Sequence, residues 1–153
     1  MTKQDLVHQL TARLEERERV MLAAARETAE NATGEETRSE GKYDTRAIEA
    51  GYLAGAQQAQ AEKITEDLAL IRGMSLRDYT QADPIAVGAL VETDLNGETQ
   101  FFLLSPAAGG ETLEFLGCET TVLAPDAPLF RELLGKSAGD TLPGSGLMIL
   151  AVE

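Results

Sequence analysis

The pattern of hydrophobic and polar positions changes near residue 84. Residues 3–32 contain neither glycine nor proline, and their apolar side chains recur at helical spacing. A second helical stretch covers about residues 45–72, with Asp44 or Thr45 available to cap its start and Gly73 to end it. Beyond Asp83-Pro84, short apolar runs alternate with turn-forming residues. This pattern predicts two long helices followed by a strand-rich region.

The two helical stretches are long enough to require a partner. At a rise of about 1.5 Å per residue each is about 40–45 Å long, and helices of this length need to bury an apolar stripe. Thr2-Lys3-Gln4-Asp5 has the form of a capping box, so the first helix is expected to start there. We expect an antiparallel hairpin with Leu6, Leu10, Leu68 and Leu70 packed at its base. The expected seam consists of Val7, Leu10, Leu14, Met21, Ala24 and Thr28 on one helix, and Ile48, Tyr52, Ala56, Ala59, Leu70 and Ile71 on the other.

The second half of the chain has the pattern of a small sheet with one helix. Strands are predicted at residues 86–95 and 98–104, on either side of Asn96-Gly97, which suits a type I′ turn. After Gly109-Gly110 a second pair is predicted at 111–116 and 118–124. A short helix at 127–134 and a last strand at 147–152 complete the order.

This order of elements predicts an α+β protein. A long N-terminal antiparallel helical hairpin, or coiled coil, is followed by a small antiparallel-sheet domain with one helix. We place the hairpin at residues 1–77, with an acidic tip at about 33–44, and the sheet domain at 84–153. Two separately folding units joined near residues 73–84 are therefore expected.

Charge and cysteine content narrow the classes of function. The net charge is −13, and residues 82–153 carry 2 basic and 11 acidic side chains. Direct binding to nucleic-acid phosphates would need clustered Lys and Arg, so protein or cation partners are favoured. One cysteine, Cys118, allows no internal disulfide and no cysteine-rich zinc site, and we expect it to be buried in a strand. His8 has no companion ligands and is expected to be a surface or seam residue.

The same sequence predicts the compartment. It contains no run of about 18 apolar residues that could span a bilayer, and its first residues lack the apolar stretch of a signal peptide. We expect a cytoplasmic protein without a membrane partner.

Residues 127–142 carry a more specific pattern. Leu129, Leu133 and Leu134 lie at helical spacing, Gly135 follows where a left-handed C-cap is needed, and Gly139-Asp140 forms the next turn. The segment resembles the C-terminal domain of GreA/GreB-like transcription elongation factors, which carry Pro-Leu-x-x-x-Leu-Leu-Gly-Lys-x-x-Gly-Asp at the corresponding place. The hairpin, connector and sheet domain together are similar to the whole Gre architecture, whose C-terminal domain is FKBP-like.

The resemblance implies a function. Gre factors bind bacterial RNA polymerase at its secondary channel, with the globular domain at the rim and the hairpin reaching towards the catalytic Mg²⁺. Acids at the hairpin tip then help to hold a second Mg²⁺, because a two-metal site stabilises both the attacking and the leaving oxygens. On this chain the candidate metal-binding residues are Glu35, Glu36, Glu40 and Asp44. The chain is expected to be a monomer that modulates polymerase and has no catalytic residue or cofactor of its own, any Mg²⁺ being shared with the polymerase.

Several alternatives stay open. The tip acids do not have the spacing of the family's Asp-x-x-Glu-Asn-Ala-x-Tyr segment, which residues 27–32 match only loosely. The effect could therefore be stimulation of cleavage of backtracked RNA, or inhibition or altered initiation without cleavage. The acids could also form a solvated loop in which Asp44 caps the second helix and Tyr43 packs against the helix ends. A generic coiled-coil adaptor is a further alternative, and a prolyl isomerase is disfavoured because residues 84–153 contain no Trp or Tyr.

Overall fold

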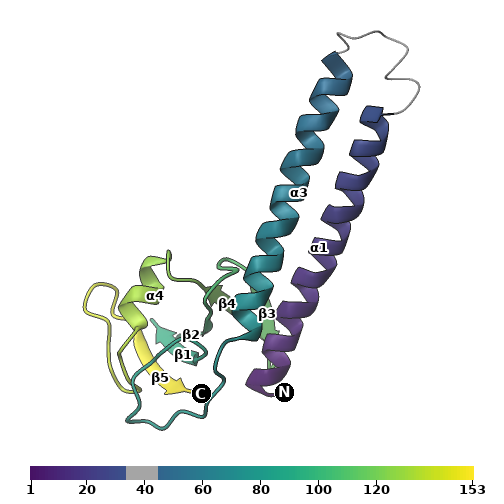
Figure 1. Cartoon of the computed structure of the whole chain (residues 1–153). Coiled ribbons are helices and arrows are strands. Elements are labelled where there is room, and N and C mark those ends of the chain that lie inside the picture. Colours follow the sequence, from purple (N-terminus) through teal and green to yellow (C-terminus); the bar gives the residue numbers. More distant parts are fainter. Residues whose placement is uncertain (34–44) are drawn as a thin grey trace. The chain divides into compact units, whose positions relative to one another are not determined.

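The computed structural model describes residues 1–33 and 45–153 (Figure 1). Helices α1 (Lys3–Thr33) and α3 (Thr45–Arg72) come first in the chain. They are followed by strands β1 (Leu90–Leu95), β2 (Glu98–Leu104), β3 (Thr112–Phe115) and β4 (Cys118–Leu123), helix α4 (Pro128–Leu133) and strand β5 (Met148–Val152). The predicted α+β class and the order of its elements are confirmed.

The chain forms two compact units. The hairpin unit is Ala12–Leu68, and the sheet unit consists of Met1–Thr11 together with Ala69–Glu153. The first turns of α1 and the last turn of α3 therefore belong to the sheet unit. The expected division near residues 73–84 stays a prediction.

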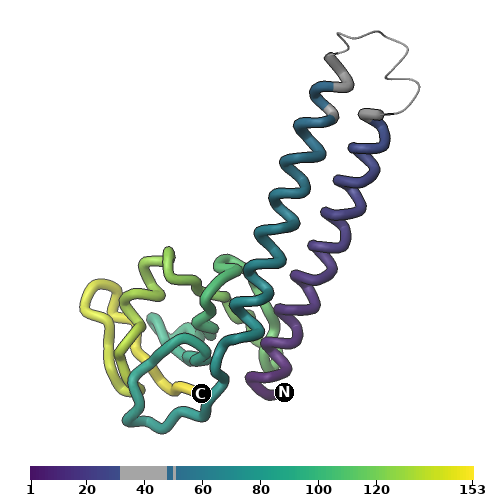
Figure 2. The backbone as a smooth tube through the Cα atoms, viewed as in Figure 1, coloured from purple at the N-terminus to yellow at the C-terminus, as the bar shows by residue number. Residues whose placement is uncertain are grey.

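In the hairpin unit, α1 and α3 run antiparallel and side by side (Figures 1 and 2). The Thr65 hydroxyl of α3 donates to the Glu18 carboxylate of α1 across 3.0 Å. Leu14 and Ala25 of α1 are buried. On α3 the buried positions of this unit are Ala61, Ile64 and Leu68, which follow a step of three and then four residues, as a helical seam requires.

The predicted seam is correct for the first part of α1 and largely wrong for α3. Val7, Leu10 and Leu14 are buried, and Ile71 is buried on α3. The side chains of Tyr52, Ile48 and Leu70, by contrast, are 77%, 54% and 52% exposed. Ala56 and Ala59 are exposed as well. From Ala50 to Ala61 the sequence alternates small and amide side chains with few large apolar ones, so periodicity alone could not select the buried face.

The start of α1 forms the predicted capping box. The Asp5 backbone N–H donates to the Thr2 hydroxyl over 3.2 Å, and the Thr2 backbone nitrogen donates to the Asp5 carboxylate over 2.7 Å. The Asp5 carboxylate accepts from both the Thr2 backbone nitrogen and the Thr2 hydroxyl, and these two hydrogen bonds lower the pKa of Asp5. The predicted helix start is therefore confirmed at the level of individual hydrogen bonds.

The five strands of the sheet unit lie in the order β3-β4-β2-β1-β5. The sheet is mixed, and the prediction of a wholly antiparallel sheet is wrong for one pair, because β4 runs parallel to β2. After β2 the chain first forms β3 at the edge of the sheet. It then returns as β4, which fills the position between β3 and β2. One intervening strand reverses the direction, so β2 and β4 point the same way.

Two tight turns connect the antiparallel pairs. Asn96 and Gly97 have φ values of 55° and 85°, which is the conformation of a type I′ turn. Leu116 and Gly117, with φ of 51° and 77°, connect β3 to β4 in a similar way. The first strand begins at Leu90 rather than at the predicted residue 86, because Gly88 has a left-handed φ of 95° that interrupts an extended conformation.

A hydrophobic core lies between α4 and one face of the sheet. Phe130 and Leu133 of α4 pack in one buried cluster with the strands. The strand and loop members of that cluster are Ile85, Ala89, Val91, Phe102, Leu104, Leu123, Leu142, Leu147, Ile149 and Val152. Since Phe102 and Leu104 point to this face, the buried Leu103 between them points to the other. Both faces of the sheet therefore contain buried apolar residues.

Candidate functional site

The candidate metal-binding residues Glu35, Glu36, Glu40 and Asp44 lie outside the described residues, as does Tyr43. The helices that lead to them are described: α1 ends at Thr33 and α3 begins at Thr45. Residues 27–32, the loose match to the family's tip segment, are therefore helical. In sequence, the acids fall between the two helices, where the predicted tip was placed.

Residues 50–61 of α3 are uncharged and mostly small. Between Ala50 and Ala61 the helix carries no charged side chain, although a quarter of the whole chain is charged. A Cβ atom added at Gly51 or Gly55 would meet no atom within 4 Å, so both glycines face open space. This section of the helix is therefore electrically neutral, and its large exposed side chains are Tyr52 and Leu53.

Residues 127–142 fold as their pattern predicts. Pro128 opens α4, where its missing N–H is tolerated, and Phe130 and Leu133 are the buried face of the helix. Leu134 ends the helix with its backbone N–H donating to the Phe130 carbonyl at 3.0 Å, and its side chain is 46% exposed. Gly135 then takes the left-handed conformation at φ 83°. The exposed Leu134 and Lys136 therefore lie on either side of a rigid helix stop.

Residues 135–137 are held by hydrogen bonds to residues 83–85, which lie between α3 and β1. The Gly135 N–H donates to the Ile85 carbonyl at 2.8 Å, and the Ile85 N–H donates to the Lys136 carbonyl at 2.7 Å. The Ser137 hydroxyl also donates to the Asp83 carbonyl at 3.2 Å. The position of the Leu134–Lys136 stop is thus set by residues 83–85.

The same segment also covers part of the edge of β5. Asp140 closes a turn by accepting from the Ser137 N–H at 2.8 Å. The Gly139 N–H then donates to the Ile149 carbonyl at 2.8 Å, and the Ile149 N–H donates to the Asp140 carbonyl at 2.9 Å. The predicted Gly139-Asp140 turn is confirmed, and it satisfies backbone groups of an edge strand that would otherwise be open.

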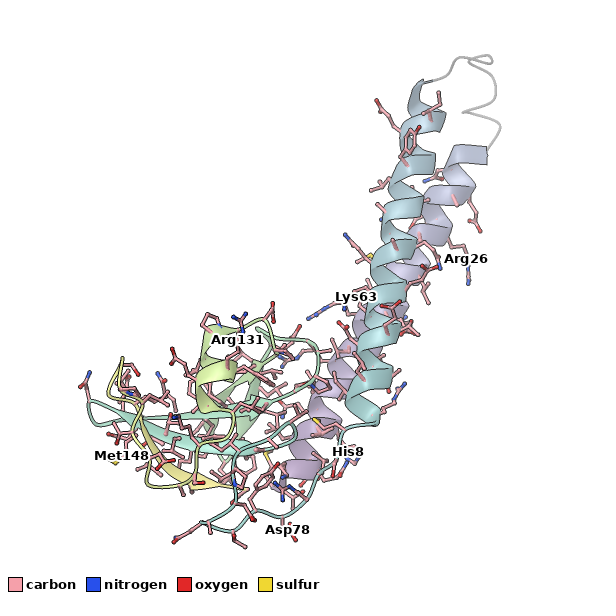
Figure 3. The ribbon with its side chains drawn as sticks, turned by 60° about the vertical axis from the view of Figure 1, so that its left-hand side comes forward. His8, Arg26, Lys63, Asp78, Arg131 and Met148 are labelled. Atoms are coloured by element: carbon pink, nitrogen blue, oxygen red, sulfur yellow. The ribbon has the colours of Figure 1, made fainter. Side chains whose placement is uncertain are left out.

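Arg131 and Lys136 are the two cationic residues after residue 82. The Arg131 guanidinium donates to the Pro125 and Asp126 carbonyls at 3.1 and 3.0 Å, which fixes the loop before α4 (Figure 3). Lys136 is exposed. The surface of residues 127–142 therefore combines the exposed Leu134 with two exposed cationic residues, Arg131 and Lys136, in a strongly acidic half of the chain.

Sequence reasoning missed two contacts that shape the sheet unit. The Gln9 side chain accepts from the Glu114 N–H at 2.9 Å and donates to the Glu114 carbonyl at 3.1 Å, so it pairs with the edge strand β3. Lys3 and Arg77 lie 4.9 and 4.3 Å from the centre of the Tyr79 ring. Burial lowers the pKa of Lys3. Residues this far apart in sequence give no periodic signal that would pair them.

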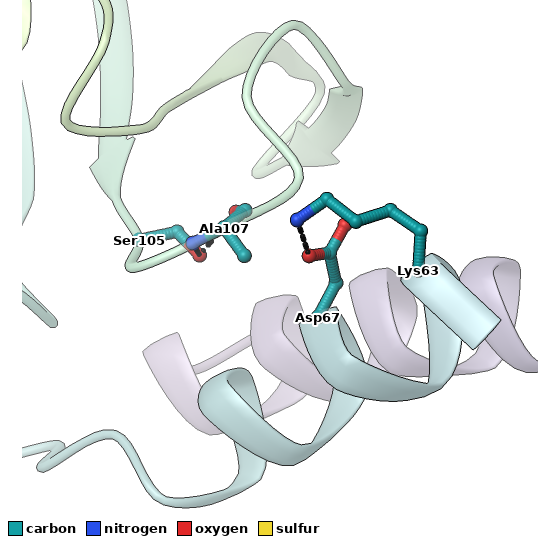
Figure 4. Close-up of polar contacts among 4 residues, drawn as sticks. All are labelled: Lys63, Asp67, Ser105 and Ala107. Atoms are coloured by element: carbon teal, nitrogen blue, oxygen red, sulfur yellow. Dashed lines mark hydrogen bonds and ion pairs between the residues drawn. The ribbon is translucent and has the colours of Figure 1, made fainter. Parts of the chain in front are cut away.

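Polar contacts inside each unit are local. In the hairpin unit Lys63 pairs with Asp67 at 2.7 Å, which raises the pKa of Lys63 (Figure 4). In the sheet unit the buried Ser105 hydroxyl donates to the Ala107 carbonyl at 2.7 Å and holds the loop after β2. Neither arrangement forms a reactive group.

The structure shows where the candidate reactive residues His8 and Cys118 lie. Within residues 1–33 and 45–153, no group of three or more His, Cys, Asp or Glu residues could hold a metal ion. His8 is exposed and lies 3.2 Å from the Gln4 amide nitrogen, as a surface residue. Cys118 is exposed, and its predicted burial is wrong because it is the first residue of β4, directly after the Leu116-Gly117 turn. None of the helices in the described ranges is long and apolar enough to cross a membrane.

Comparison with known proteins gives structural neighbours only. No protein-family model matches the sequence, and no curated protein matches it. Among solved structures, the GreA factor homolog 1 (Gfh1) protein of Thermus thermophilus is 20% identical, with 96% of this chain and 94% of that chain covered and a TM-score of 0.36. Gfh1 of Thermus aquaticus is 23% identical over 91% and 93% of the two chains, with a TM-score of 0.38. A third structure, described as the transcription factor Gfh1, is 23% identical over 97% and 93%, with a TM-score of 0.37.

Proposed function

We propose that this chain is a Gre-type transcription factor that acts in the bacterial cytoplasm as a monomer. In this proposal the sheet unit docks on RNA polymerase at the rim of the secondary channel, and the helical hairpin enters the channel. The observation that carries the proposal is the conformation of residues 127–142. Their Leu-Leu-Gly-Lys sequence forms a rigid helix stop with Leu134 and Lys136 exposed, as a docking element requires.

The length of the hairpin helices supports an action inside the channel. α1 and α3 contain 31 and 28 residues, so each is about 42–46 Å long at about 1.5 Å per residue. Gly51 and Gly55 leave two positions of α3 without a side chain, and residues 50–61 carry no charge. A helix pair of this kind can enter a passage that would not admit a globular domain.

The proposed chemistry belongs to the polymerase. Glu35, Glu36, Glu40 and Asp44 would present carboxylates near the catalytic Mg²⁺, where additional oxygen ligands would help to retain a weakly held second ion. The factor itself would carry no catalytic residue. Stimulated cleavage of backtracked RNA and inhibition of synthesis are the two outcomes that such ligands could produce.

The test measures binding to core RNA polymerase of the native host. The variant Leu134→Glu with Lys136→Glu should weaken binding by about tenfold or more, because it places two carboxylates in the proposed contact. Leu116→Glu, which changes another exposed leucine in the same unit, is the control and should bind normally. Thermal melting of each variant establishes that it is folded. Absence of binding by the unmodified chain, or equal binding by all variants, would reject the proposal.

A coiled-coil adaptor is the second candidate function. The exposed Ile48, Tyr52 and Leu53 lie within two turns of α3 and could pack against another helix. Sedimentation separates the two candidates, because the Gre-type proposal expects a monomer. An obligate dimer that buries these three side chains would favour the adaptor.

A further inference from the structure

A hollow of about 390 Å³ opens on the face of the sheet that also packs against α4. Its lining on β2 is residues 98–102, of which Glu98, Gln100 and Phe102 alternate along the strand and share one face. Phe102 pairs with Thr121 of the parallel strand β4, so Thr121 and Glu119 lie on the same face. The hollow thus lies beside the core, with an aromatic residue in its lining and polar side chains around it.

The hollow is lined by two carboxylates and, among the described residues, by no Lys or Arg side chain. Glu98 and Glu119 are both exposed and both line it, and within the described ranges neither forms an ion pair. Glu114 stands directly opposite Glu119 in the β3–β4 pairing and adds a third carboxylate next to the hollow. Neither of the two cations after residue 82 lines it, and the Arg131 guanidinium is bound to backbone carbonyls before α4. The surface is therefore complementary to a positive charge.

We propose that this hollow receives an arginine side chain from the protein partner. A guanidinium has five N–H donors in a plane and can bond to two acceptors at once, whereas Glu98 and Glu119 present acceptors from neighbouring strands. The apolar stem of the arginine would pack on Phe102, which is 8% exposed at the border of the core. The Gln100 amide and the Thr121 hydroxyl offer further acceptors.

The chemistry of the hollow distinguishes this ligand from others. Nucleic acid is disfavoured because the lining brings carboxylates towards phosphates. A divalent cation is disfavoured because, among the described residues, no three acidic side chains come close enough together to hold a metal ion. The inference rests on the proposed function for the identity of the partner, which would be RNA polymerase, but the chemistry of the hollow can be tested without it.

The first experiment measures affinity for core RNA polymerase as a function of salt. The variant Glu98→Gln with Glu119→Gln keeps the size of both side chains and should bind about tenfold more weakly, with a smaller dependence on salt concentration. The control, Glu92→Gln with Glu153→Gln, removes the same charge from the same unit at residues that do not line the hollow, and should bind normally. Equal affinity and equal salt dependence of both variants would overturn the inference.

The second experiment uses a blocked Ala-Arg-Ala peptide and the isotopically labelled full chain. The peptide should shift the amide resonances of Gln100 and Thr121, the shifts should disappear in the double Gln variant, and an Ala-Glu-Ala peptide should cause none. If the arginine peptide causes these shifts but the chain does not bind polymerase, arginine binding in the hollow is supported and the proposed function is rejected. Binding to polymerase without them, together with unchanged affinity of the double Gln variant, would overturn the hollow alone. A response to Mg²⁺ with none to the arginine peptide would also overturn it.

Discussion

At the scale of single residues, Gly88 lies where the backbone of Ser75 leaves no room for a side chain. A Cβ atom at this position would lie 2.1 Å from the Ser75 carbonyl oxygen, and the φ of 95° is unfavourable for any other residue. We predict that Gly88→Ala lowers the free energy of unfolding by about 2 kcal/mol or more, because a backbone clash adds to conformational strain. Gly144→Ala, where a Cβ would meet open space, is the matched control in thermal melting. Equal melting temperatures of the two variants would contradict this account of Gly88.

Two fully buried threonines differ in one hydrogen bond. The Thr93 hydroxyl donates to the Gln100 carbonyl at 3.0 Å, whereas the Thr120 hydroxyl has no hydrogen-bond partner among the described residues. Thr120→Val should therefore raise the free energy of unfolding by about 1 kcal/mol, since it replaces an unsatisfied buried hydroxyl with a methyl group of similar shape. Thr93→Val should lower it by about 1 kcal/mol. Chemical denaturation measures both, and a loss of stability in Thr120→Val would show that its hydroxyl is satisfied.

At the scale of elements, one glutamine side chain forms hydrogen bonds with the backbone of one residue at the exposed edge of the sheet. Gln9 of α1 makes two hydrogen bonds with the backbone of Glu114 in β3, which is the last strand on its side of the sheet. Gln9→Ala should cost about 1 kcal/mol of stability, because both bonds are lost but water can replace them at this exposed edge. Gln58→Ala, at an exposed position of α3, should have little effect. If the two variants unfold at the same denaturant concentration, the pairing contributes nothing measurable.

Two aspartates stabilise local turns in a way that depends on pH. Hydrogen bonds from Thr2 lower the pKa of Asp5, and hydrogen bonds from Thr80 lower the pKa of Asp83. Since the folded pKa lies below the unfolded value of about 3.9, this stabilisation is complete above that value and is lost as the pH falls through the folded pKa. Asp5→Ala with Asp83→Ala should therefore be less stable than the unmodified chain at pH 6, with a difference that shrinks towards pH 2. A difference that is constant with pH would show that the charge of these two carboxylates does not produce the effect.

At the scale of the whole molecule, docking and action are expected to be separable. Replacing Glu35, Glu36, Glu40 and Asp44 by Ala should abolish the effect on transcription while affinity for core polymerase stays within about threefold, because the proposed docking residues lie in the sheet unit. If Asp44 caps the second helix, its replacement would lower the free energy of unfolding by about 1 kcal/mol, so thermal melting is the required control. Titration with Mg²⁺ should show an altered metal requirement. Full activity of the variant on stalled and initiating complexes would remove the tip from the mechanism.

The local elements could be predicted from the sequence because their signals are local. The bounds of α3, the Thr2–Asp5 capping box and the Asn96-Gly97 turn each depend on residues within a few positions of one another. The helix stop at Gly135 follows from the same kind of signal. The conformational preference of a capping hydroxyl, of a glycine at positive φ or of an apolar repeat does not depend on residues far away in the sequence. The order of elements, and with it the α+β class, follows directly.

Only the tertiary structure decided which distant residues meet. The insertion of β4 between β3 and β2 makes one pair parallel, and this depends on a choice among strand partners that each strand's own pattern leaves open. The buried face of α3 was likewise undetermined, because small and amide side chains between Ala50 and Ala61 give no contrast to a periodic pattern. The Gln9–Glu114 pairing and the acidic hollow at Glu98 and Glu119 arise from residues far apart in sequence. Such contacts form because packing the whole chain brings these residues together, and no short segment contains that information.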